Sequence, residues 1–151
     1  MNSEFTIAVH SLVLLAHLPE HMASSDDIAS NVCTHSARIR KIMGCLRKAG
    51  FVRTKEGCGG GFILNHDPDE ITLGDIYQLT SLGTLKPNWC SGDQGNECLV
   101  SANMQNVMDN MLDGAEQNMI QYLKGVTIGS MLRTLNETEK RAADAEKNLI
   151  S

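Results

Sequence analysis

Residues 36 to 62 read SARIRKIMGCLRKAGFVRTKEGCGGGF, a stretch that joins a basic amphipathic helix to a glycine-tipped hairpin. Successive residues of an α-helix turn by about 100°, so the apolar side chains of residues 36 to 49 gather on one side of the helix and most of the cations on the other. The apolar positions are Ile39, Ile42, Met43, Leu46 and Ala49. Gly50 follows at the point where a left-handed cap residue is expected, so the helix should end there.

Two short runs of β-forming residues, 52–55 and 62–65, flank a loop of six residues, four of which are glycine. A hairpin accommodates such a loop readily. The glycine run lacks the Lys-Ser/Thr pair of a nucleotide-phosphate loop and precedes a strand instead of a helix, which makes the phosphate-loop alternative weak. We therefore expect these residues to form a wing beside the helix.

The chain before this stretch predicts two further helices. Apolar residues recur at steps of three and four over residues 5–16, with others on the remaining faces, so neighbours should nearly enclose this helix, which Pro19 ends. Ser24 and Asp27 resemble a capping box that opens a short second helix, and a tight turn at residues 33–35 follows. Two short helices joined by a tight turn, the second basic on its outer face, make a helix-turn-helix.

Positive charge is concentrated in one part of an acidic protein. The 151-residue chain has a formal net charge of −5, yet residues 36 to 55 hold seven lysines and arginines and no aspartate or glutamate. An ordinary surface helix mixes charges of both signs for mutual support, so binding to a polyanion explains this run better than simple solvation does. The first 55 residues carry plus three and the rest minus eight, which indicates a half that faces nucleic acid and an acidic half.

We therefore expect the chain to bind DNA through this segment. Residues at the start of the basic helix are the candidates for contacts with base edges or nearby phosphates: Thr34, Ser36, Arg38 and Arg40. Cations further along the helix and on the first strand of the wing are expected to contact the phosphate backbone, where they add affinity without sequence information: Lys41, Lys48, Arg53 and Lys55.

The remaining residues predict a long functional loop and an apolar helix that needs a partner. Thr72 caps a fourth helix, and a long loop at residues 83–97 follows it. Apolar residues from 99 to 123, several of them methionines, approximate a heptad seam on a helix that needs a partner, and we expect packing rather than metal binding there. Thr127 begins a last short helix that ends near residue 135. The expected units are a DNA-binding domain at 1–82, a sensor loop at 83–98, dimerisation helices at 99–135 and a charged, solvated or frayed tail at 136–151.

Several classes of protein are excluded or disfavoured by composition. The most apolar run, residues 5–18, is shorter than the roughly 20 residues that a bilayer requires and lacks the marks of a signal peptide, so we expect a cytoplasmic protein. Five cysteines, an odd number without a C-x-x-C pair, argue against a disulfide framework. The same absence, with no histidine near the later cysteines, argues against a thiol reductase, and we expect no catalysis.

Residues 5 to 82 resemble the winged-helix bacterial regulators of the Rrf2 family. The resemblance rests on five runs: 25–29 (SDDIA), 40–43 (RKIM), 46–52 (LRKAGFV), 57–64 (GCGGGFIL) and 71–76 (ITLGDI). It implies a homodimer, mainly α-helical with a small β wing, that docks its third helix in the major groove of a palindromic operator, with each wing at a minor groove and a long dimerisation helix behind. Glu56 departs from the basic residue that members commonly place before the first glycine of the wing. An acid repels phosphate, so Arg53 and Lys55 are expected to take over that contact.

The resemblance also bears on how a signal is sensed. Members that bind an iron–sulfur cluster carry three closely spaced cysteines between the fourth helix and the dimerisation helix, whereas this chain has Cys90 and Cys98 there. A cluster would require Cys58 from the wing or atypical ligands, so we expect no cofactor. The two thiols are candidates for redox or electrophile sensing, with inert free cysteines as the alternative. Asp93 and Glu97 nearby are expected to raise the thiol pKa and slow such chemistry.

The sequence thus predicts a sequence-specific DNA-binding transcriptional regulator that acts as a repressor and responds to redox state. Two alternatives remain open. One is a winged-helix protein-interaction module without DNA binding, which the acidic total charge and Glu56 permit. The other is an iron–sulfur-sensing regulator with atypical ligands.

Overall fold

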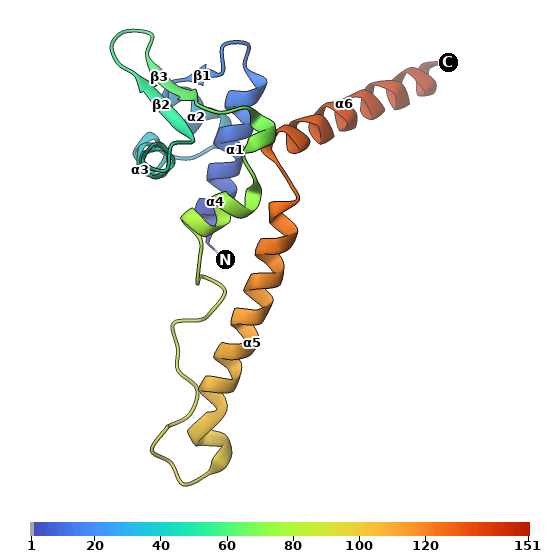
Figure 1. Ribbon diagram of the computed structural model, residues 1–151. Helices are drawn as coiled ribbons and strands as arrows, with labels where there is room; N and C mark the ends of the chain where they lie inside the picture. The colour runs from blue at the N-terminus through green and yellow to red at the C-terminus, as the bar shows by residue number, and fades with distance from the viewer. Residues whose placement is uncertain (1) are drawn as a thin grey trace.

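The computed structural model describes residues 2–151 and shows a winged-helix unit from which two long helices extend in different directions (Figure 1). The unit contains a small sheet and five helical segments: α1 (Ser3–His17), α2 (Ser25–Val32), α3 (Ser36–Lys48), the 3-10 helix η1 (Pro68–Glu70) and α4 (Leu73–Thr80). The long helices are α5 (Leu99–Lys124) and α6 (Ile128–Ile150). The predicted fold class, mainly α with a small β wing and a long helix behind it, is confirmed.

Helix α1 lies in the middle of the unit, as its apolar pattern predicted. Its Ala8, Leu12 and Leu15 have no exposed surface, and the helix contacts α2, α3, α4, α6 and β3. Full burial of one leucine side chain contributes about 1.5–3 kcal/mol. Helix α1 is therefore the scaffold against which the other elements of the unit are held.

Helix α3 buries the apolar side that its sequence predicted. The buried residues are Ile39, Ile42, Met43 and Leu46. Ala49, expected on the same side, is instead exposed at the C-cap. Gly50 has a φ of +87°, and the amides of Gly50 and Phe51 each donate a 3.0 Å bond back to the last turn, to the carbonyls of Arg47 and Leu46. This Schellman arrangement ends the helix where predicted and turns the chain into the sheet.

The wing belongs to a three-stranded antiparallel sheet in the order β1-β3-β2. The predicted hairpin is formed by β2 (Val52–Lys55) and β3 (Gly61–Leu64). Strand β1 (Met22–Ala23) was not predicted, because two residues are too few to show the alternation of a strand. A side chain at Gly61 would collide with the carbonyl of Ala23, so the last glycine of the run is what allows β1 to pair with β3.

The starts of α4 and α6 lie side by side. Thr72 caps α4 by accepting the amide of Asp75 at 3.1 Å, and Thr127 forms a capping box with Ser130, which confirms both predicted caps. The amide of Leu73 in α4 also donates to the carbonyl of Val126, just before α6, at 2.8 Å. Helix α6 was expected to end near residue 135. It continues as one helix to Ile150, and every residue from 136 onward is exposed, so the tail is a solvated helix.

Helix α5 has a large apolar face that nothing in the described chain covers. Seven of its large apolar side chains are exposed: Leu99, Val100, Met104, Val107, Met108, Met111 and Tyr122. Among the described residues of α5, only Glu116 and Ile120 are buried against the rest of the chain. Neither α5 nor any other helix within residues 2–151 is long and apolar enough to cross a membrane.

Candidate nucleic-acid interface

The cations of α3 and β2 are all exposed to solvent. Helix α3 packs against α1, α2, α4 and β2 through its apolar side, which leaves its basic side to solvent. Strand β2 buries Val52 and exposes its other three residues. These two neighbouring elements carry seven exposed cations, which we call the basic face: Arg38, Arg40, Lys41, Arg47, Lys48, Arg53 and Lys55.

Most of the basic face has no anionic partner within the chain. Lys41 Nζ pairs with Glu4 Oε1 at 3.2 Å, and Arg38 donates to the hydroxyl of Ser3. Among the residues that the structure describes, none of the other five cations forms an ion pair with a carboxylate. These five charges are therefore free to meet an external anion. Arg47, which was not among the predicted site residues, is placed as openly as the others.

The two hydroxyl candidates at the start of α3 are less free than the cations. Ser36 is half-buried, and its Oγ donates to Asp26 Oδ1 on α2 at 2.5 Å. Thr34 is also half-buried, in the turn between the helices, and its backbone amide donates to the carbonyl of Ala29 at 3.0 Å. Both hydroxyls lie next to the basic face, and Ser36 Oγ retains acceptor capacity.

The wing tip is exposed and mixed in charge. Glu56 follows Lys55 directly, and both are exposed, as is Cys58 in the glycine loop. The carboxylate of Glu56 would therefore repel any anion that the wing tip approaches. The two cations of β2 lie closer to α3 along the chain than the tip does, so they extend the basic face without it.

A buried carboxylate that sequence reasoning missed fixes the root of the loop after α4. Glu116 of α5 is 6% exposed, and its Oε1 accepts both the hydroxyl of Tyr77 at 2.8 Å and the amide of Gly83 at 2.7 Å. Burial and the bond to Glu116 raise the pKa of Tyr77, which keeps its hydroxyl a donor. Lys86 and Asp113 form a second link at 2.7 Å. The loop root is thereby attached to α5.

The cysteine part of the loop runs along the start of α5 (Figure 1). The amide of Ser91 donates to Gln105 Oε1 at 2.6 Å, and the amide of Asp93 donates to the carbonyl of Ser101 at 3.1 Å. Cys90 and Cys98 are both exposed, and Cys98 is the N-cap residue of α5. The predicted candidates for thiol chemistry are thus accessible to solvent.

The prediction that nearby acids would raise the thiol pKa is wrong for Cys98. The backbone amides of Ser101 and Val100, at the N-terminus of α5, lower the pKa of Cys98 because they stabilise the thiolate. The sequence showed the two nearby acids, but it did not show that Cys98 is the N-cap residue of α5. The start of α5 therefore favours the thiolate form of Cys98.

The donor set of one protomer does not fit an iron–sulfur cluster held by four protein ligands. The loop supplies two cysteines, whereas Cys58 belongs to the β2–β3 turn at the opposite end of the molecule (Figure 1). Across residues 2–151, no three histidine, cysteine or acidic side chains lie together in a way that could hold a metal ion. Clusters of this kind are usually held by four cysteine thiolates.

A helix-turn-helix with a wing and an exposed basic face defines the class of DNA-binding regulators. A protein-family model described as "Rrf2: Iron-dependent Transcriptional regulator" matches residues 1–134. The chain therefore belongs to the Rrf2 family of transcriptional regulators, and neither this family nor the relatives below are enzymes.

Named relatives and solved structures agree with this assignment. The chain is 27% identical to the HTH-type transcriptional regulator NsrR of Shouchella clausii, over 87% of this chain and 85% of that protein. It is also 27% identical to Protein rrf2 of Nitratidesulfovibrio vulgaris, over 88% and 86%. The fold matches T. potens IscR with a TM-score of 0.67 at 24% identity, over 91% of this chain and 89% of that one.

Proposed function

We propose that this chain works as a homodimeric repressor that binds a palindromic DNA operator through its basic face. The observation that carries the proposal is the set of five exposed cations on α3 and β2 that have neither an ion pair nor a side-chain hydrogen bond among the described residues: Arg40, Arg47, Lys48, Arg53 and Lys55. Cations left unpaired in the free protein gain most from phosphate, because no internal ion pair has to be broken first. Binding to the chromosome would place the protein in the cytoplasm.

The apolar face of α5 supports a dimer. Val107 and Met111 are 55% and 67% exposed, and they lie within a continuous run of exposed apolar side chains. Monomeric proteins rarely expose apolar patches of this kind, because covering them removes apolar surface from water. Helix-turn-helix dimers place their two recognition helices about 34 Å apart, one turn of DNA, and we expect the same spacing for the two copies of α3.

Within this proposal the residues have different roles. Arg40 is exposed and unpaired near the start of α3, so it is our first candidate for base contact. Lys48, Arg53 and Lys55 would contact phosphates on either side of the groove, and Arg47 joins them. Thr34 and Ser36 would add contacts beside the turn, and Arg38 and Lys41 would have to leave or share their partners on α1.

A selection from random duplex DNA tests this function. We expect the selected sequences to share an inverted repeat whose halves are centred about 10 base pairs apart, because two symmetric helices read two symmetric half-sites. Recovery of no common motif, with binding equal to that of random DNA, would contradict sequence-specific recognition and favour the protein-interaction alternative.

We further propose that Cys90 and Cys98 form the thiol switch, and we predict that Cys98 reacts first. Its lowered pKa means that the thiolate is half-populated at a lower pH than an ordinary thiol, so more of it is reactive near pH 7. Iodoacetamide at pH 7 should alkylate Cys98 faster than the exposed Cys58 of the wing, as followed by peptide mass spectrometry.

In a separate experiment, mild oxidation of the protein should change its affinity for DNA.

The variant with both Cys90 and Cys98 replaced by serine is the control for this switch. It should bind DNA like the reduced wild type and ignore the oxidant. An unchanged oxidant response in that variant would remove both cysteines as the switch. Equal alkylation of Cys98 and Cys58 would remove Cys98 as the first thiol to react.

A further inference from the structure

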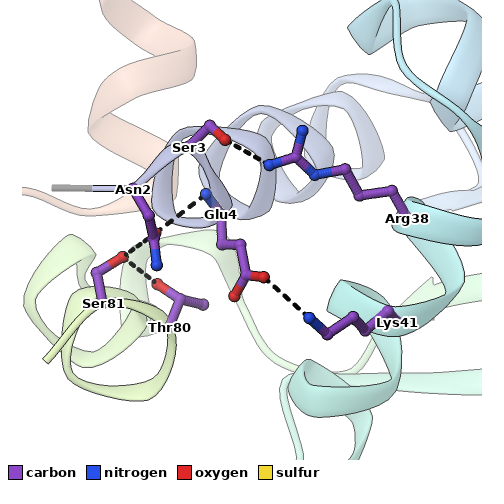
Figure 2. A network of polar contacts seen from close by, with 7 residues as sticks. All are labelled: Asn2, Ser3, Glu4, Arg38, Lys41, Thr80 and Ser81. Atoms are coloured by element: carbon purple, nitrogen blue, oxygen red, sulfur yellow. Dashed lines mark hydrogen bonds and ion pairs between the residues drawn. The ribbon is translucent and has the colours of Figure 1, made fainter. Parts of the chain in front are cut away.

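The first turn of α1 lies against the recognition helix α3 and holds two of its cations (Figure 2). Glu4 Oε1 is 3.2 Å from Lys41 Nζ, and the hydroxyl of Ser3 accepts a hydrogen bond from the Arg38 guanidinium. These contacts join positions 37 and 35 residues apart in the chain. The start of α1 thus lies beside the basic face, although the two are far apart in the sequence.

This first turn is itself fixed from the other side. Asn2 is the N-cap of α1, and its Oδ1 accepts a hydrogen bond from the amide of Glu4 at 3.2 Å. The same oxygen accepts a hydrogen bond from the hydroxyl of Ser81 at 2.8 Å. Ser81 is 1% exposed and is the C-cap residue of α4, so the buried end of α4 holds the exposed Asn2 (Figure 2). The backbone of Glu4 is therefore linked through Asn2 to the end of α4.

Glu4 places a negative charge beside the basic face. Among the described residues it is the one carboxylate that pairs with a cation of the basic face. The Lys41 side chain is 72% exposed, whereas that of Glu4 is 31% exposed. Lys41 can therefore swing to an external anion, while the less exposed carboxylate stays at the edge of the basic face.

We infer that Glu4 sets the affinity of this protein for DNA by competing with a backbone phosphate for Lys41. The inference rests on the proposed DNA-binding function. A phosphate and a carboxylate are alternative anionic partners for the same ammonium group, so DNA gains Lys41 only by replacing Glu4. The acid that remains nearby then repels the phosphate. Glu4 is thus an affinity-setting residue that acts through Lys41 without a contact to DNA of its own.

The test is a double-mutant cycle in DNA affinity. Glu4→Gln keeps the shape and polarity of the side chain and removes its charge. Binding to the selected operator should become about two- to thirtyfold tighter, because one exposed ion pair is removed in each protomer of the dimer. In a Lys41→Gln background the same Glu4→Gln change should have a smaller effect, because the competed cation is gone. Glu146→Gln, at an exposed position near the end of α6, removes an equal charge far from α3 and should leave affinity unchanged.

Three outcomes overturn the inference. One is that Glu4→Gln alters the dissociation constant no more than Glu146→Gln does. Another is that Glu4→Gln has the same effect with and without Lys41, which would assign the effect to total charge. If the wild type itself does not bind duplex DNA, the proposed function fails together with the inference. A failure confined to the Glu4 variants leaves the proposed function standing.

Discussion

Arg40→Ala should weaken binding to the operator at least about thirtyfold. A well-placed arginine contact to a base is worth about 1–3 kcal/mol, and a symmetric dimer loses one such contact at each half-site. Arg40 lies on the exposed side of α3, and within residues 2–151 it has no ion pair to break before it binds. Fluorescence anisotropy of labelled operator DNA at physiological salt measures the loss.

The matched control for Arg40 is Arg141→Ala. Arg141 is an exposed arginine on the solvated part of α6, so its removal changes net charge equally without touching the basic face. It should leave the dissociation constant within about twofold of the wild type, as surface changes away from an interface usually do. If Arg40→Ala and Lys41→Ala both bound like the wild type, the assignment of α3 as recognition helix would be wrong.

Val107→Glu should convert the protein to a monomer and abolish operator binding. Val107 is 55% exposed in the middle of the apolar face of α5, with Met104, Met108 and Met111 around it. A two-fold interface would bring the new carboxylate of each protomer into an apolar, desolvated contact, where an unpaired charge is strongly unfavourable. Light scattering after size-exclusion chromatography measures the mass, and anisotropy measures the binding.

Asn106→Glu separates the effect of the interface from that of charge on α5. Asn106 is exposed on the same helix, and the turn of about 100° per residue directs it away from the centre of the apolar face. This variant should remain dimeric and bind DNA. A Val107→Glu protein that stayed dimeric and bound the operator would show that α5 is not the dimer interface.

Local patterns were sufficient to predict the winged-helix unit. The apolar side of α3, the left-handed Gly50 and the caps at Thr72 and Thr127 each depend on residues within a few positions of one another. Such features are visible in sequence because they are governed by helix geometry and backbone conformation. The excess of positive charge on the basic face could also be predicted, because all seven cations lie close together in the sequence.

Features that depend on distant residues were missed. The pairing of β1 with β3, the burial of Glu116 and the ion pair between Glu4 and Lys41 all join segments that are far apart in the chain. An acid on an amphipathic helix is usually exposed, so nothing local indicated that Glu116 would anchor a loop. The lowered pKa of Cys98 likewise depends on where α5 begins.

The central claim, that the basic face holds DNA, is tested most directly by the salt dependence of operator binding. Each neutralised phosphate releases counterions and contributes about −0.9 to the slope of log affinity against log salt. With several unpaired cations on each protomer, the account predicts a straight line with a slope of about −4 or steeper. A slope near zero, or no measurable binding to any duplex at low salt, would contradict it.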